Sequence, residues 1–377
     1  MTGLFDVIAV GGGPAGSAAA TVLAQAGRSV LVLEKDRFPR AKVCGEFLSA
    51  DASASLERLG LRESVERLGA ETIVRGSIHP PAGASVSFCL PAPALGISRF
   101  LFDDLLARRA AQAGADVRFG ARVVSVEKVA PGRFRVRAVQ AQNEIELESG
   151  IVVGAWGRWD ALDRSLERAF VRRRSRFFGW SRDYGGETRS LAEQVRLYLF
   201  PGGYCGLSRV EGGTVNLAGI VSESVLRRAG TSWEAVCRHA RESNASLDTE
   251  LSAFEPGPVG FLGTGPVFFT AKPSVENGIL MTGDAAGVID PFSGEGQASA
   301  LASGILAGET IEDGLSAGLS TDEIARVYAR VWKLSFERRF RSSRLLRLLM
   351  LHPTLGRLAG RVAGERLVRF GIAATRS

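Results

Sequence analysis

The segment FDVIAVGGGPAGSAAATVLAQAGRSVLVLEK, residues 5–35, constrains the fold more than any other part of the chain. Its apolar residues 5–10 predict a strand, its alanine-rich residues 14–26 predict a helix, and residues 29–33 predict a second strand. A G-x-G-x-x-G motif separates the first strand from the helix. This order is that of a βαβ unit, so the sequence predicts an α/β fold with a Rossmann-type, doubly wound domain.

The residues of this motif have separate physical tasks. Gly11 permits a tight turn, Gly13 lets a pyrophosphate approach the backbone, and Gly16 lets the helix pack close to the sheet. Pro14 and Ala15 open the helix, whose free N–H groups and positive dipole end favour phosphate. We therefore predict that this loop binds a dinucleotide; the alternative is a glycine-rich turn without a ligand.

An acidic residue ends the second predicted strand. Glu34, followed by Lys35, lies about 20 residues beyond the glycine motif, where a carboxylate accepts hydrogen bonds from ribose hydroxyls. This unit alone leaves the choice between FAD and NAD(P) open.

The cysteine and histidine pattern limits the other kinds of site. The four cysteines form no C-x-x-C pair, and the three histidines are scattered, so a zinc site or a disulfide framework is not expected. The N-terminus lacks the pattern of a signal peptide, and no apolar run reaches about 18 residues. We therefore expect a cytoplasmic protein of two or more domains.

The positive charge of the chain is concentrated at its C-terminal end. Residues 326–377 carry 13 Lys or Arg and 2 Asp or Glu, a net of +11, which leaves −4 for residues 1–325. Leu345, Leu348 and Leu349 lie at helical spacing among arginines, so this helix could contact anionic lipid as a peripheral membrane segment. We favour the alternative, a helix that caps the first domain. Nucleic-acid binding is not expected, since aromatic residues are not interleaved with the basic ones.

A second motif, NGILMTGDAAGVIDPFSGEGQASALASGILAGE, occupies residues 277–309. A short strand over 279–282 precedes Gly283 and Asp284, and a helix is predicted to start near 294–296. The motif resembles the second flavin fingerprint of the flavoprotein hydroxylase and geranylgeranyl reductase superfamily. The resemblance implies FAD, with Asp284 on a ribityl hydroxyl and with the isoalloxazine at the helix N-terminus, near Gly294, Gly296 and Gln297.

A third match is ISRFLFDDLLARRAAQAGADVRFGARVVSVE, residues 97–127, which predicts a helix over 102–113 and a strand over 117–126. In the family an arginine just before the aspartate that opens this helix reaches the cofactor, and Arg99 and Asp103 match these positions. Val123 matches the place where backbone groups meet the adenine. Arg99 could instead cap the helix, and for Asp103 we favour a plain N-terminal helix charge.

The sequence departs from the family at IVVGAWGRWDALDR, residues 151–164. Trp156 stands where the family carries the aspartate of an Asp-Gly pair associated with nicotinamide and flavin contacts. NAD(P)H remains the expected reductant, but the family's mode of binding it is in doubt. A second complete dinucleotide motif is absent, which disfavours a reductase with two Rossmann domains.

The stretches between these motifs predict an inserted domain. Segments such as SIHPPAGASVSFCL and VRLYLFPGGYCGLSRV alternate polar and apolar residues, which is typical of an antiparallel sheet. In the superfamily such a sheet covers the flavin and forms the substrate cavity. The predicted division is an FAD-binding domain of residues 1–75, 95–165 and 255–325, a substrate-binding domain of residues 76–94 and 166–254, and basic C-terminal helices over 326–377.

Three aromatic residues of the inserted domain are candidate substrate contacts. The segment around Phe200 and Tyr204 partly resembles the isoprenoid-reductase pattern Y-x-W-x-F-P, although the tryptophan is missing and Gly206-Leu207 stands where a bulkier residue would go. Trp180 lies in the aromatic and basic segment SRFFGWSRDYGG, which could line a cavity for a planar or lipidic molecule. The alternatives are ordinary hairpin packing for Tyr204 and an ordinary loop for the segment of Trp180.

The segment RAKVCGEFLS, residues 40–49, resembles a Cys-Gly loop of the reductase branch that lies along the flavin. The resemblance places Cys44 and Gly45 near the ring. A thiol beside Arg40 and Lys42 could exchange a proton with the substrate. The alternative is a small packing residue.

These motifs together resemble an FAD-dependent oxidoreductase of the geranylgeranyl reductase-like branch of the aromatic-hydroxylase fold. The resemblance implies hydride transfer through flavin N5 to or from a hydrophobic small molecule, such as an isoprenoid or another secondary metabolite. A monooxygenase that uses FAD and NAD(P)H is the main alternative, and a halogenase or a non-enzymatic flavin carrier is less favoured. The sequence leaves the oligomeric state open.

Overall fold

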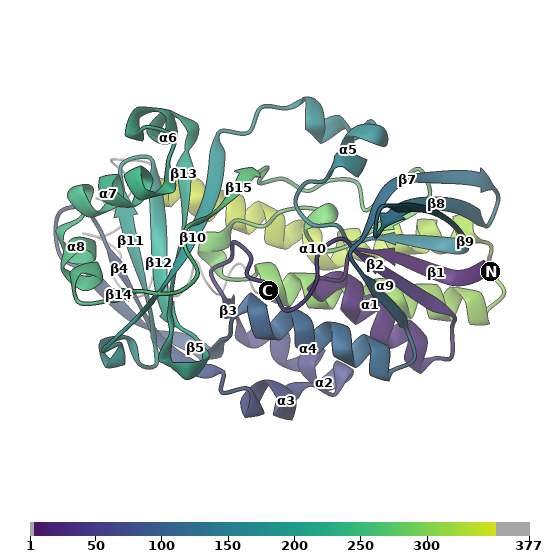
Figure 1. Ribbon diagram of the computed structural model, residues 1–377, viewed down its shortest axis with the longest axis horizontal. Coiled ribbons are helices and arrows are strands. Elements are labelled where there is room, and N and C mark those ends of the chain that lie inside the picture. Colours follow the sequence, from purple (N-terminus) through teal and green to yellow (C-terminus); the bar gives the residue numbers. More distant parts are fainter. Residues whose placement is uncertain (1–3, 352–377) are drawn as a thin grey trace.

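Two β-sheets organise the chain, and Figure 1 shows them at opposite ends of the molecule. The computed structural model describes residues 4–351 and, among these, the side chains of residues 4–343. The predicted fold class, a Rossmann-type α/β domain with an inserted antiparallel sheet and a C-terminal helical segment, is confirmed.

The first sheet has a parallel centre built on the βαβ unit. Its strands run in the order β16 (Val275–Glu276), β17 (Ile279–Met281), β9 (Asn143–Gly154), β1 (Leu4–Val10), β2 (Val30–Glu34) and β6 (Asp116–Phe119). Strands β17, β9, β1, β2 and β6 are parallel, whereas β7 (Ala121–Ala130) and β8 (Arg133–Gln140) form an antiparallel meander with the start of β9. The carboxyl ends of β1 and β17 therefore meet at one edge of the sheet.

Close helix packing brings the two glycine motifs together at this edge. Helix α1 (Pro14–Gln25) lies between α4 (Arg99–Gln112) and α9 (Gly296–Ser316). A side chain on Gly304 of α9 would place its Cβ 2.2 Å from the carbonyl oxygen of Ala15, which no real Cβ tolerates. Glycine at this position thus lets α9 approach the backbone of α1, and the N-terminal ends of both helices lie on the same cavity.

The second sheet is antiparallel except for one pair of strands. It runs in the order β14 (Glu255–Pro256), β10 (Phe177–Gly185), β13 (Val215–Ser222), β12 (Gly203–Arg209), β11 (Gln194–Phe200), β4 (Glu71–His79), β5 (Val86–Gly96) and β3 (Phe47–Leu48), with β15 (Leu262–Pro266) paired to β10. Strands β11 and β4 are parallel. Helices α6 (Glu223–Ala229), α7 (Trp233–Ser243) and α8 (Ala245–Ser252) cover its outer face (Figure 1).

Smaller helices and one long helix complete the fold. Helices α2 (Ser53–Leu59), α3 (Arg62–Arg67) and α5 (Ala161–Ser165) lie beside the first domain, and α10 (Thr321–Leu351) packs on α9. Tyr328, Trp332 and Phe336 of α10 join the core of the first sheet, which supports the capping alternative for the start of this segment. The leucines predicted to face lipid, Leu345, Leu348 and Leu349, lie outside the described side chains. Among residues 4–351, no helix has the length and apolar character needed to cross a membrane.

Two predicted elements have different bounds in the structure. The strand predicted over 117–126 is divided into β6 and β7 at Gly120, whose φ of +69° turns the chain. Helix α4 begins at Arg99 rather than Phe102, because the Ser98 hydroxyl caps it by accepting a hydrogen bond from the backbone N–H of Leu101.

Candidate functional site

Two adjoining hollows run along the edge where the glycine motifs meet. A hollow of about 330 Å³ lies beside Glu34, and one of about 250 Å³ lies between the glycine loop and the second sheet. Gly13, Lys42, Ala155 and Arg158 line both. Together the hollows have the size of a small-molecule site, for which about 300–1,000 Å³ is usual.

The first glycine motif leaves an open backbone surface at this junction. Gly11 has a φ of +107°, and a Cβ there would lie 2.4 Å from the carbonyl oxygen of Ala155. A Cβ on Gly16 would lie 1.9 Å from the carbonyl oxygen of Gly11, so these two glycines permit the turn and the close packing. A Cβ on Gly13 would meet only the Arg99 guanidinium, at 3.8 Å. No side chain caps α1 at Gly13, so its N–H groups remain available to a phosphate.

Glu34 lines the first hollow. Its buried carboxylate accepts hydrogen bonds from the backbone N–H groups of Gly12, at 2.7 Å, and Asp36, at 2.9 Å. Val123 lines the same hollow, and Lys35, which follows Glu34, pairs with Asp160 at 2.7 Å. A carboxylate held in this way is oriented to accept from ribose hydroxyls as well.

Arg99 and Asp103 form a buried ion pair beside Gly13. The Arg99 guanidinium donates to both carboxylate oxygens of Asp103, at 2.5 and 2.7 Å, and Arg40 reaches the same carboxylate at 3.2 Å. Burial alone would lower the pKa of Arg99, but the Asp103 carboxylate raises it above its ordinary value. Asp103 is fully buried, so it orients Arg99 rather than acting as an exposed helix charge.

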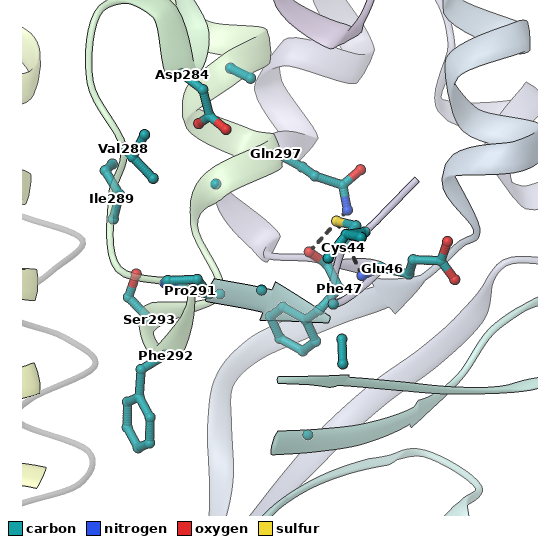
Figure 2. Close-up of a pocket in the computed structure, with 18 of the residues that line it drawn as sticks. Cys44, Glu46, Phe47, Asp284, Val288, Ile289, Pro291, Phe292, Ser293 and Gln297 are labelled. Carbon is teal, nitrogen blue, oxygen red and sulfur yellow. Dashed lines mark hydrogen bonds between the residues drawn. The ribbon is translucent and has the colours of Figure 1, made fainter. Parts of the chain in front are cut away.

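The second glycine motif forms the opposite wall (Figure 2). Asp284 lines the second hollow, and its side chain lies 3.8 Å from the Arg158 guanidinium. The Lys272 ammonium donates to the carbonyl oxygens of Asp284, at 2.9 Å, and Arg158, at 2.8 Å. Because Lys272 holds both backbones, the loops that carry Asp284 and Arg158 have a common support.

The start of α9 has a turn at Gly294 and a side-chain amide at Gln297 that could contact a planar ring. Gly294 has a φ of +71°, and a Cβ on Gly296 would meet no atom within 4 Å. Gln297 donates from Nε2 to the carbonyl oxygen of Phe47 at 3.4 Å (Figure 2). Its buried Oε1 atom has no hydrogen-bond partner within the described part of the chain. An unpaired amide oxygen fits a bound ring with an N–H group, which the pyrimidine part of isoalloxazine carries.

The loop of Cys44 lies across the hollow from Asp284 (Figure 2). The Cys44 thiol accepts a hydrogen bond from the backbone N–H of Glu46 at 3.4 Å. Asn216 of β13 donates to the carbonyl oxygen of Cys44 at 2.9 Å, and Ser208 of β12 donates to that of Gly45 at 3.4 Å. The second sheet therefore holds the backbone of this loop.

Glu46 in this loop has an unusual backbone and carboxyl group. Its φ is +53°, a left-handed conformation uncommon outside glycine. Its carboxyl oxygen accepts a hydrogen bond from the backbone N–H of Arg99 at 2.9 Å. Burial and the neighbouring Glu211 carboxylate raise its pKa to about 8, although the hydrogen bond from Arg99 opposes this.

The inner face of the second sheet forms the apolar wall of the second hollow. Side chains alternate between the two faces of each strand, and Tyr204 and Gly206 of β12 belong to the inner face. The Tyr204 hydroxyl donates to Asp290 at 3.0 Å. Phe200 of β11 packs in the core under α6–α8 and does not reach the hollow. Trp180 borders the hollow, but its fully buried indole belongs to that same outer core.

Most predicted site residues line the two hollows. They are Gly11, Gly13, Pro14, Ala15, Glu34, Lys35, Cys44, Gly45, Arg99, Val123, Trp180, Tyr204, Gly283, Asp284, Gly294, Gly296 and Gln297. Gly16 and Phe200 do not line them.

The sequence interpretation missed a buried network behind Trp156. The Trp156 indole N–H donates to Asp163 at 3.0 Å, and the fully buried Arg168 donates to the same oxygen at 2.9 Å. Arg168 also donates to the carbonyl oxygen of Ala285 at 3.0 Å, so the network supports the second glycine motif. The pattern Asp160-x-x-Asp163 is a capping box, and it was the available signal that Asp163 points inward.

Comparison with known proteins gives the same assignment of the first domain. Residues 5–180 match the family model described as FAD binding domain. The protein is therefore a flavoprotein, and its class is that of the FAD-dependent oxidoreductases. The glycine cradle, the oriented carboxylate of Glu34 and the unpaired amide oxygen of Gln297 fit this cofactor.

Curated relatives define the family more narrowly. The chain is 30% identical over 351 residues to digeranylgeranylglycerophospholipid reductase 1 of Methanopyrus kandleri, covering 90% of this chain and 89% of the relative. It is 29% identical over 380 residues to the menaquinone reductase of Mycolicibacterium smegmatis, covering 95% and 87%. A geranylgeranyl bacteriochlorophyll reductase-like protein of Thermoplasma acidophilum shares the fold, with a TM-score of 0.75, 20% identity and coverage of 99% and 92%. The chain belongs to the geranylgeranyl reductase-like family of FAD-dependent oxidoreductases.

Proposed function

We propose that this flavoenzyme transfers a hydride to a carbon–carbon double bond of an elongated hydrophobic molecule or, in the reverse direction, from the corresponding saturated carbon–carbon bond. The observation that carries the proposal is the apolar hollow between the Cys44 loop and the second sheet. Its lining comes from six neighbouring strands, β10, β13, β12, β11, β4 and β5. At about 4.8 Å between strands, five gaps correspond to about 24 Å across the sheet.

The chemistry of the lining supports an apolar substrate rather than a polar one. The residues that face the hollow include Ile78, Phe88, Leu197, Ile220, Val288 and Phe292. Such walls exclude water and bind by burial of apolar surface. Both curated relatives described above are named as reductases, which supports reduction as the direction of the reaction.

Bound FAD would supply the redox chemistry by exchanging a hydride at N5. We assign its pyrophosphate to the glycine loop Gly11–Gly16, its adenosine ribose to Glu34 and its ribityl chain to Asp284. The isoalloxazine would lie at Gly294–Gln297, with Arg99 beside the phosphates. These assignments rest on the open backbone at Gly13, the orientation of Glu34 and the unpaired Gln297 amide.

Cys44 is the proposed proton donor or acceptor at the substrate carbon. Its thiol lies on the second hollow, and the backbone N–H of Glu46 points at its sulfur atom. This hydrogen bond orients the sulfur atom in the loop. Asn216 and Ser208 hold the loop backbone, so the sulfur atom keeps its position relative to the apolar wall.

NAD(P)H is the proposed reductant. Trp156, in place of the family aspartate, lines the first hollow, and its indole is held by Asp163. A nicotinamide cofactor would therefore meet an apolar surface at this position rather than a carboxylate.

The test is anaerobic reduction of the purified holoenzyme with NADH or NADPH, followed by addition of geranylgeraniol, menaquinone or air. Rapid reoxidation by an alkene, with recovery of a saturated product and slow reaction with oxygen, supports the proposal. Rapid formation of peroxide or of an oxygenated product would contradict it and support the monooxygenase alternative. Cys44→Ser should keep bound FAD and lose turnover, whereas the exposed Cys89→Ser should keep both.

A further inference from the structure

Lys42 lies where the two hollows meet and has a distinct electrostatic role there. It lines both hollows. Arg40 and Arg99 both reach Asp103, at 3.2 and 2.5 Å, and Arg40 also pairs with Asp36 at 2.9 Å. Within residues 4–343, no carboxylate lies within salt-bridge distance of the Lys42 ammonium, whereas Arg158 lies 3.8 Å from Asp284. Lys42 is thus a cation at the junction without an acidic partner.

The position of Lys42 relates it to the open backbone of the glycine loop. A Cβ on Gly157, in the loop after β9, would lie 3.8 Å from the Lys42 ammonium nitrogen. A Cβ on Gly13 would lie 3.8 Å from the Arg99 guanidinium. Gly13 lines both hollows, as Lys42 does, so the lysine and the free N-terminal end of α1 border the same space.

The charges around this space favour an anion. The charged groups that act most strongly on Lys42 are Arg40 in its own loop, Arg99 and Asp103 on α4, and Arg158 after β9, which are three cations and one carboxylate. The other charged residues that line the hollows are Glu34, Lys35, Asp36, Glu46, Asp160 and Asp284. Burial and, after it, the nearby Arg99 and Arg40 guanidinium groups lower the pKa of Lys42 to about 8, against the opposite effect of Asp103. An anion bound at the junction would offset this repulsion and return the lysine to its charged form.

We propose that Lys42 binds the pyrophosphate of FAD and that its charge makes the retention of FAD depend on pH. The diphosphate is the negatively charged part of FAD, and negative charge is what the cations around Lys42 favour. It is also the part of a dinucleotide that a glycine loop at a helix N-terminus binds. Lys42 acts here as a cofactor-binding residue, independently of the substrate on which the enzyme acts.

The direction of the pH effect follows because the protonated, charged form of Lys42 is the form that binds FAD. Below pH 8 the free protein already carries the charge on Lys42, so the affinity for FAD is at its highest. Above pH 8 binding must recharge the lysine, and the affinity falls by up to about tenfold per pH unit until the pKa in the complex is reached. Between pH 7.5 and pH 9.5 we expect the dissociation constant of FAD to rise about tenfold or more.

The experiment is titration of the FAD-free protein with FAD from pH 7 to pH 9.5, followed by flavin fluorescence. Lys42→Met should bind FAD more weakly at pH 7 and lose the pH-dependent change. Lys42→Arg should bind tightly across the range, because a guanidinium stays charged. Lys333→Met removes the same charge from an exposed position on α10 and should behave like the wild type.

Two outcomes would overturn the proposal. In the first, Lys42→Met binds FAD as tightly as the wild type with the same pH profile. In the second, Lys42→Arg loses affinity above pH 8 as the wild type does, and this comparison also serves if Lys42→Met fails to fold. Circular dichroism of each FAD-free variant identifies such a failure.

Discussion

Replacing Asp163 by Ala tests whether the buried network of Trp156, Asp163 and Arg168 stabilises the fold. Asp163 is fully buried and accepts three hydrogen bonds, from Trp156 at 3.0 Å, Arg168 at 2.9 Å and the backbone N–H of Asp160 at 2.8 Å. The substitution leaves the fully buried Arg168 with Glu276 as its remaining carboxylate partner.

The expected loss of unfolding free energy follows from these contacts. Breaking a buried ion pair costs about 3–5 kcal/mol, because one charge stays buried with too few partners. An indole N–H left without an acceptor costs about 1–3 kcal/mol by itself. Since Arg168 keeps Glu276, the two costs do not add in full, and we expect a loss of about 3–5 kcal/mol.

The assay is urea-induced unfolding of the FAD-free protein, followed by circular dichroism. Asp248→Ala is the matched control, because it removes an aspartate from an exposed pair with Arg241 that lies 2.6 Å apart. Such a pair contributes about 0–1 kcal/mol. If Asp163→Ala lost no more stability than Asp248→Ala, the network would not stabilise the fold and our reasoning would be wrong.

Three further predictions concern the hollows. Asp284→Ala should weaken FAD binding about 10- to 100-fold, the range expected for a lost hydrogen bond to a charged group, and unchanged affinity in a fluorescence titration would contradict our assignment of the ribityl chain. Gly206→Trp should weaken the binding of geranylgeraniol at least about tenfold and leave FAD bound, because a Cβ there meets Leu197 at 3.0 Å and the carbonyl oxygen of Arg196 at 3.8 Å, and an indole would fill the hollow. The raised pKa of Glu46, about 8, means that its contribution to stability is complete below its unfolded value of 4.5 and is lost as the pH rises toward 8. Glu46→Gln should therefore gain stability relative to the wild type between pH 5 and pH 8. If the difference in urea midpoint between the variant and the wild type were the same at pH 5 and at pH 8, this carboxyl would ionise normally.

The sequence predicted the parts of the site that are local in the chain. The glycine motif and Glu34 belong to one βαβ unit, so a single stretch of residues contains the turn, the helix N-terminus and the acid. Asp284 and Gln297 could be predicted for the same reason. The resemblance to the superfamily supplied the cofactor, because local geometry alone left FAD and NAD(P) open.

Other features depend on contacts between distant parts of the chain. Phe200 and Tyr204 are four residues apart, yet they lie on opposite faces because a hairpin turn separates β11 from β12. Alternation indicates that a strand has two faces, but it does not say which face meets the cofactor domain. The partners of Arg168 are similarly remote, since Glu276 and the carbonyl of Ala285 follow it by 108 and 117 residues along the chain.

The position of Cys44 shows why the inserted sheet matters to the chemistry as well as to the substrate. The loop belongs to the first half of the chain, but its carbonyl groups are held by Asn216 and Ser208 of the second sheet. The thiol therefore shares a support with the apolar wall, while Arg158, Arg99 and Gln297 connect the same loop to the first domain. Loss of a hydrogen bond from the second sheet would let the thiol change its position relative to the substrate wall. Asn216→Ala should for this reason slow the proton step and leave both FAD affinity and substrate affinity close to those of the wild type, which separate titrations of the two ligands and single-turnover kinetics can establish.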